Sequence, residues 1–152
     1  MPFIKESRAV GELVGAGTGL RRIIVLIQSV APDEIVYMHR HADGDQILRV
    51  LSGELRVEVS GETRTCAASD IAVVPAGESH GFAAMGEPAL LEVIGEQGCG
   101  TSFAVHCDDG ALEWIEVHRP ELPWDRAGEP TDIDALNERA IPPAAGDAGP
   151  RR

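Results

Sequence analysis

The chain has 152 residues, of which 43% are hydrophobic and 25% are charged, and its formal net charge is −12. These proportions are typical of one globular domain with its own core, and the negative charge argues against binding to nucleic acid or to an anionic membrane surface, because both select basic patches. The cysteines are odd in number and lack a C-x-x-C spacing, and the apolar run 23–27 is too short to span a membrane. We therefore expect a cytoplasmic protein with free thiols.

Short segments rich in valine and isoleucine, separated by Gly, Pro and Asp turns, follow one another through the first 120 residues. In one of them Leu55, Val57 and Val59 alternate with polar residues, which is the period of a strand with one buried face. No long amphipathic helix and no repeat interrupts the series, so we expect an all-β antiparallel sandwich or barrel. The predicted strands are 20–30, 35–41, 46–51, 54–60, 63–66, 70–74, 81–84, 89–94, 101–106 and 113–117.

The composition changes after Pro120. The sequence around Asp132 is typical of a helix N-cap, and a short helix is predicted near 135–139. We expect Pro120, Pro123 and Trp124 to hold a strap across the outside of the barrel, with Trp124 packed against the barrel or against a second subunit. The end of the chain is rich in Pro, Ala and Gly and predicts a disordered tail. The predicted divisions are an N-terminal arm (1–19), a barrel (20–124), and a C-terminal helix with a flexible tail (125–152).

Four polar side chains have spacings that fit a metal site: His39, His41, Gln46 and His80. A strand places His39 and His41 on one face, because side chains alternate with a period of two, and Tyr37 is expected on that face as well. A turn at 43–44 brings Gln46 onto the next strand facing the same interior, and His80 follows a Pro-x-Gly turn. Imidazole is a common metal ligand. We predict one divalent ion, with Zn, Ni, Mn, Fe and Cu all open.

The segment 33–84 resembles the two motifs of the cupin superfamily, G-x5-H-x-H-x3,4-E-x6-G and G-x5-P-x-G-x2-H-x3-N. Three turn or supporting positions depart from the pattern (Asp33, Ser69 and Ala84), and Gln46 stands where the pattern has glutamate. The resemblance extends over about residues 20–118. It implies a small antiparallel β-barrel or jelly roll with a metal at its centre, of the compact bacterial type, often forming a homodimer. The positions that match in type and spacing are His39, His41, Gly53, Pro75, Gly77 and His80.

Glutamine in place of glutamate changes the charge of the predicted site. Three imidazoles and a carboxylate leave a divalent ion at net +1, whereas three imidazoles and the amide of Gln46 leave it at +2. The neutral set binds the ion less tightly but polarises a carbonyl or an oxyanion more strongly. We therefore expect a metal-dependent enzyme with Lewis-acid chemistry on an oxygenated small molecule, of isomerase, cyclase or lyase type. A metal-dependent dioxygenase, a non-catalytic ligand-binding cupin and a degenerate metal-free site are the alternatives.

Two further side chains are candidate catalytic groups. Tyr37 is expected to act as an acid or hydrogen-bond donor, or to fill the barrel beside the metal. Glu92 lies in an apolar segment, where it is either a general base near the metal or a residue of the wet face. The candidate substrate contacts are Gln28, Arg49 and Phe82, the last as an apolar wall near His80.

Overall fold

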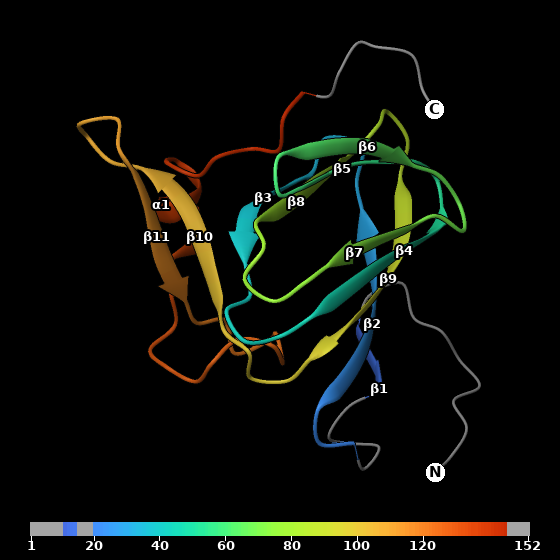
Figure 1. Cartoon of the computed structure of the whole chain (residues 1–152), viewed down its shortest axis with the longest axis horizontal. Helices are drawn as coiled ribbons and strands as arrows, with labels where there is room; N and C mark the ends of the chain where they lie inside the picture. The colour runs from blue at the N-terminus through green and yellow to red at the C-terminus, as the bar shows by residue number, and fades with distance from the viewer. Residues whose placement is uncertain (1–10, 15–19, 146–152) are drawn as a thin grey trace.

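The computed structural model describes residues 11–14 and 20–145, which form eleven strands and one short helix. Figure 1 shows the strands wrapped into two layers with the helix at one side. The predicted strands are all present, with bounds that differ by a few residues. The elements are β1 (Gly11–Val14), β2 (Ile23–Val30), β3 (Ile35–Arg40), β4 (Gln46–Ser52), β5 (Leu55–Val59), β6 (Glu62–Cys66), β7 (Ile71–Val74), β8 (His80–Ala84), β9 (Ala89–Glu96), β10 (Thr101–His106), β11 (Leu112–Val117) and α1 (Ile133–Asn137).

The strands form two antiparallel sheets, ordered β1-β2-β9-β4-β7 and β11-β10-β3-β8-β5-β6. Strand β1 was not predicted. It lies within the expected N-terminal arm and pairs with β2, with Gly11 opposite Ile27. Residues 1–10, 15–19 and 146–152, which include the rest of that arm and the last part of the predicted tail, lie outside the described residues. No helix in the described ranges is long and apolar enough to cross a membrane.

The main core lies between the two sheets, as the alternation of apolar residues predicts. In β4, Gln46, Leu48 and Val50 are buried while the residues between them are exposed. In the opposite sheet, β5 and β8 supply Leu55 and Phe82 to the same apolar cluster. Because both sheets bury one face, a shift by one residue in any strand would expose its apolar set, and this fixes the register of the strands.

A β-bulge interrupts β3 just before the predicted ligands. Val36 pairs with Phe82 and His39 pairs with His80, so three steps along β3 match two steps along β8. The extra residue puts Val36 and His39 on the same face, although their spacing in the sequence predicts opposite faces. Val36 packs against the main core, whereas Tyr37 packs in the second apolar cluster, beside β10 and α1. Simple alternation therefore does not hold between Val36 and His39, and Tyr37 packs with the second cluster rather than with the main core that Val36 joins.

A segment near the end of the described chain lies between β3 and β10. These strands pair only at Ser102 with Arg40 and at Phe103 with His39. Beyond this point, the Met38 backbone N–H donates to the Ile141 carbonyl at 2.8 Å, and the Ile141 N–H donates to Ala104 at 3.3 Å. Residues 139–141 thus act as a wedge that satisfies the backbone groups of two diverging strands.

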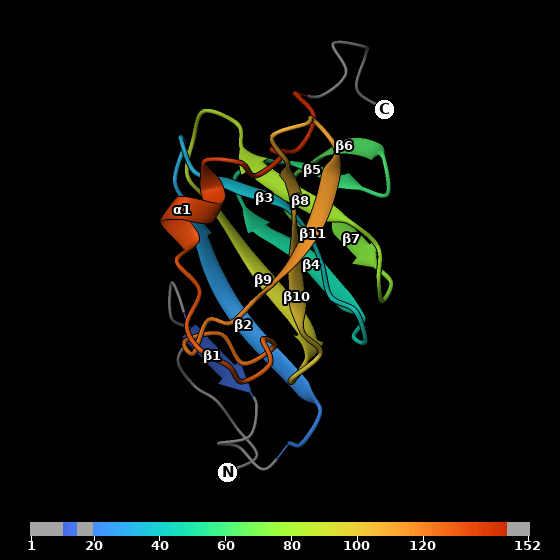
Figure 2. The ribbon, with the colours of Figure 1, turned by 90° about the vertical axis from the view of Figure 1, so that its left-hand side faces the viewer.

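Helix α1 covers the outer strands of the six-stranded sheet. Asp132 caps it by accepting a hydrogen bond from the Ala135 N–H at 3.2 Å, as the sequence predicts. The helix itself begins and ends two residues before the predicted range. Its buried Leu136 packs with Phe103, Val105 and others in the second cluster. Figure 2 shows α1 beside the sheet rather than beneath the barrel.

The segment after β11 turns inward, and the prediction of an external strap at Trp124 is wrong. Trp124 is 8% exposed and belongs to the main core. Two hydrogen bonds hold the segment against the 97–100 turn: the Gly98 N–H donates to Pro123 at 3.0 Å, and the Gly100 N–H donates to Trp124 at 2.8 Å. The proline-rich segment thus closes one wall of the interior.

Candidate metal centre

The four predicted ligands come together at one end of the interior. His39 lies on β3, and His41 is the first residue after the end of that strand. Gln46 and His80 are the first residues of β4 and β8. All four are buried, and the ligand nitrogens of the three histidines lie within 4.8 Å of one another. The turn before His80 is fixed to the end of β3, because the Gly77 N–H donates to the His41 carbonyl at 2.7 Å. The ligands thus reach one point from three strands.

A backbone carbonyl orients each imidazole through its Nδ1 atom. A carbonyl oxygen can only accept, so each Nδ1 carries the hydrogen, and the neutral ring presents the lone pair of Nε2 to the interior. Metal-binding histidines are commonly held in this way, which fixes both the tautomer and the direction of the ring. The three contacts are His39 Nδ1 to Tyr37 O at 2.7 Å, His41 Nδ1 to Gly100 O at 3.2 Å and His80 Nδ1 to Glu78 O at 3.1 Å.

Burial keeps the three imidazoles neutral. Loss of hydration lowers the pKa of His41 to about 4 and, together with the neighbouring charge of His41, lowers the pKa of His80 to about 3. For His39, burial and the two other histidines hold the pKa well below its usual value. At neutral pH all three rings are therefore in the form that binds a metal ion.

The donor set fits a divalent cation. The Oε1 atom of Gln46 lies 3.0 Å from His80 Nε2, and both atoms carry lone pairs when His80 Nδ1 holds the proton. This is roughly the separation of two donors that share one ion at about 2.1 Å from each. His41 Nε2 is buried and has no hydrogen-bond partner, which is costly for a polar atom. A cation at this point would satisfy all of these atoms.

Two glycines shape the surroundings of the site. A Cβ atom on Gly44 would lie 2.6 Å from Cys99 Cβ, so the turn between His41 and Gln46 packs closely on the 97–100 turn. Gly53 has a φ of +76°, and a Cβ there would lie 2.5 Å from the Pro88 carbonyl, so only glycine fits. Ser69 has a φ of 77°, at a position where the cupin pattern has glycine.

The other candidate residues do not gather around the ligands. Glu92 and Arg49 form an ion pair at 3.1 Å on the outer face of the five-stranded sheet. Of the two predicted roles of Glu92, this position fits a residue of the solvent-facing side and not a general base beside the metal. Gln28 faces inward. Along the strand direction, however, it lies four residues of β2, or about 13 Å, from the level of Gln46. Phe82 is part of the main core beside β5. Tyr37 offers the centre its backbone carbonyl, which accepts from His39.

The walls of the centre include residues that the sequence did not single out for this purpose. The ring of Phe103 stacks on His39 at 5.3 Å between centroids, and Trp124 meets His41 edge-on at 5.9 Å. Thr101 and Asp125 are buried polar residues behind His41. No motif connects these positions with the ligands. The pairing of β10 with β3 and the inward turn after β11 bring them together.

Comparison with known proteins agrees with the geometry. Residues 26–95 match the family model of the cupin domain. This segment carries all four donors, and the two sheets have the corresponding fold, so residues 26–95 form a cupin domain. A comparison with curated proteins gives no match.

Several solved structures have a similar fold. KdgF from Halomonas sp. is 22% identical with a TM-score of 0.53, over 57% of this chain and 76% of that one. A cupin protein from Bacteroides fragilis is 21% identical with a TM-score of 0.55, over 63% and 82%. A predicted oxalate decarboxylase from Thermotoga maritima is 19% identical with a TM-score of 0.53, over 57% and 77%. At these identities the likeness shows the fold alone.

Proposed function

We propose that this protein is a metal-dependent enzyme that uses a divalent ion held by His39, His41, Gln46 and His80 for Lewis-acid chemistry on an oxygenated small molecule. The observation that carries the proposal is the uncharged donor set, in which three neutral imidazoles with anchored Nδ1 atoms are joined by an amide. When bound, the ion supplies an electrophile that polarises a carbonyl or stabilises an oxyanion. Isomerase, cyclase and lyase reactions all use such stabilisation.

The surroundings support this chemistry in two ways. Phe103 and Trp124 line the ligands with apolar rings, which exclude water and strengthen electrostatic interactions at the ion. The donors bring no negative charge that would offset the charge of the ion. A carboxylate ligand would help a metal to reach a higher oxidation state, and its replacement by Gln46 favours non-redox chemistry.

The test begins with the metal and continues with turnover. Purified protein should contain about one equivalent of a divalent metal by mass spectrometry, and His80→Ala should lose it. His106→Gln, which removes an exposed histidine of β10, is the matched control and should keep it. Turnover of a panel of hydroxy acids, keto acids and sugar acids should disappear in His80→Ala. Full activity of the metal-free variant would refute the proposal.

A dioxygenase is the second candidate, because three histidines also suit iron, manganese, nickel or copper. The discriminating measurement is turnover with and without oxygen. An equal rate under anaerobic conditions supports the Lewis-acid proposal, and oxygen uptake that depends on substrate supports the dioxygenase. The variant Gln46→Glu adds a negative charge to the donor set, and we expect it to bind metal more tightly but to lower Lewis-acid turnover. Tight binding of a ligand without any turnover would instead indicate a binding protein.

A further inference from the structure

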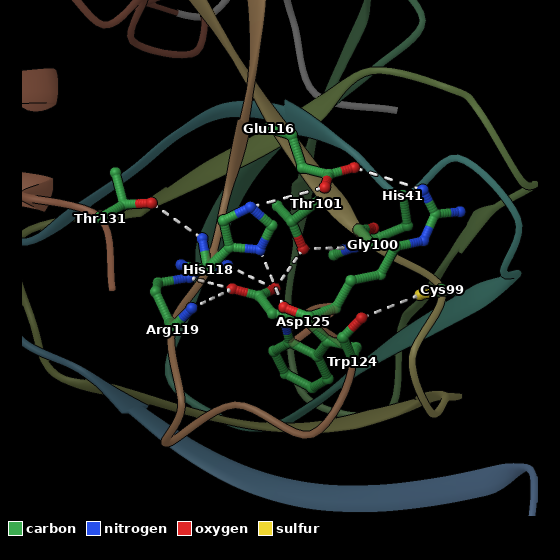
Figure 3. A network of polar contacts seen from close by, with 11 residues as sticks. His41, Cys99, Gly100, Thr101, Glu116, His118, Arg119, Trp124, Asp125 and Thr131 are labelled. Carbon is green, nitrogen blue, oxygen red and sulfur yellow. Dashed lines mark hydrogen bonds and ion pairs between the residues drawn. The ribbon is translucent and has the colours of Figure 1, made fainter. Parts of the chain in front are cut away.

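A buried chain of polar groups continues outward from His41. The Thr101 hydroxyl lies 3.0 Å from His41 Nδ1 and 2.5 Å from Asp125 Oδ1. Figure 3 shows the Thr101 hydroxyl joined on one side to His41 and on the other to Asp125, which belongs to the segment after β11. The Asp125 side chain is 1% exposed, which is unusual for a carboxylate unless it has a function or strong partners.

The direction of the hydrogen bonds in this chain is fixed by Asp125. An ionised carboxylate can only accept, so the Thr101 hydroxyl donates to it. The Thr101 oxygen then accepts from the Nδ1–H of His41, which it shares with the Gly100 carbonyl at 3.2 Å. The proton is thereby held on Nδ1, and the Nε2 lone pair faces the other ligands.

Arg119 holds the carboxylate in this orientation. Its Nε and Nη2 atoms donate to the two oxygens of Asp125 at 2.8 and 3.2 Å, and its backbone N–H donates to Oδ2 at 3.1 Å. The same guanidinium lies 5.2 Å from the ring centroid of Phe103, which stacks on His39. Because Arg119 balances the charge, a buried carboxylate is tolerated here.

We propose that Asp125 is a positioning residue for the metal ligand His41, acting through the Thr101 hydroxyl to fix the tautomer and strengthen the donor. The proposal rests on the metal site proposed above. In the described part of the chain, the Nδ1 atoms of His39 and His80 contact backbone carbonyls, those of Tyr37 and Glu78, rather than a side chain. His41 is therefore the ligand whose properties a change outside the ligand set can alter most.

Asp125→Asn is expected to reverse the direction of the hydrogen bonds between residue 125, Thr101 and His41. Two Arg119 donors, Nε–H and the backbone N–H, meet at the Oδ2 position, whereas Oδ1 receives one Arg119 donor, Nη2–H, and a Thr101 hydroxyl that can turn; the amide oxygen therefore takes the Oδ2 place and the NH₂ group faces Thr101. The NH₂ group donates to the Thr101 oxygen, and the hydroxyl then donates to His41 Nδ1, where it competes with the Gly100 carbonyl for the tautomer of the ring. The proton moves to Nε2, where it blocks the lone pair. A carboxylate-to-amide change that leaves a histidine in the wrong tautomer is strongly damaging in enzymes.

Two measurements test the proposal. Nitrogen-15 NMR of the metal-free protein should show His41 as the Nδ1–H tautomer in the native chain and as the Nε2–H tautomer in Asp125→Asn. Zinc affinity by competition titration should fall about 10- to 100-fold in the same variant. Thr101→Val, which leaves the Asp125–Arg119 pair in place, should weaken zinc binding by about tenfold, and Thr101→Ser should restore it.

The controls separate this proposal from the metal site itself. Glu116→Gln breaks a nearby ion pair with Arg126 that lies outside the chain of groups from His41 to Asp125, and it should leave zinc affinity unchanged. Native zinc affinity and an unchanged His41 tautomer in Asp125→Asn, with affinity lost in His41→Ala, would overturn the role of Asp125 and leave the metal site standing. Absence of zinc binding in the native protein would overturn both. If Asp125→Asn does not fold, the Thr101 variants decide, and native affinity in Thr101→Val would refute the proposal.

Discussion

Lowering the pH tests the burial of the ligand histidines directly, because protons and metal ions compete for the same nitrogens. At pH 5.5 a histidine with the ordinary pKa of about 6.5 loses about tenfold in metal affinity, so three of them lose about 1,000-fold. In this protein the pKa is lowered to about 4 for His41 and to about 3 for His80. Both stay neutral at pH 5.5, and His39 is shifted in the same direction. We therefore expect zinc affinity to change by less than about twofold between pH 7.5 and 5.5.

Equilibrium dialysis against zinc at pH 7.5, 6.5 and 5.5, with bound metal counted by mass spectrometry, measures this directly. The variant His106→Gln should give the same curve, since it removes only an exposed histidine. Below about pH 4 the affinity should fall steeply, because the ligands then become protonated. A loss of 100-fold or more between pH 7.5 and 5.5 would show that the ligands are hydrated in solution, and it would refute the reasoning from burial.

Three further predictions concern stability. Folding lowers the pKa of His41, so between pH 6.5 and about 4 the unfolded chain binds more protons than the folded one. From this group alone, the free energy of unfolding of the metal-free protein should fall by about 3 kcal/mol as the pH drops over that range. A free energy of unfolding in urea that does not change with pH would contradict this. Gly44→Ala places a Cβ 2.6 Å from Cys99 Cβ and should cost about 1–3 kcal/mol, whereas Gly95→Ala, with its nearest neighbour at 3.7 Å, should cost less than about 1 kcal/mol in the same assay. Leu136→Ala should cost about 2–4 kcal/mol, and an unchanged melting temperature would show that α1 does not support the second cluster.

The metal ligands were predictable from the sequence because their signal is local. His39 and His41 are two residues apart, and His80 follows a Pro-x-Gly turn whose geometry brings it to the rim of the same cavity. The alternation of apolar residues likewise predicted the strands and the core. Both signals depend on the backbone period of a strand, which a single sequence records directly.

The features that the sequence did not predict depend on contacts between distant segments. One extra residue in β3 breaks the alternation between Val36 and His39, and no residue type marks the bulge. An external strap was predicted at Trp124 because Pro120 and Pro123 precede it, yet two backbone hydrogen bonds hold this segment against the 97–100 turn. Asp125 lies 84 positions after His41 and beyond the matched cupin segment. Its role depends on tertiary structure that periodicity does not encode.

The wedge at residues 139–141 has a consequence for how the protein is made. His39 is synthesised about 100 residues before Ile141, at roughly 5–20 residues per second. The backbone N–H of Met38 in β3 therefore has no Ile141 carbonyl to donate to until that segment has been made. The nascent chain therefore holds all four donors for several seconds before the wall around them is complete. Assembly of the proposed donor set and closure of the interior are therefore separate events in time, and the second depends on nearly the last of the described residues.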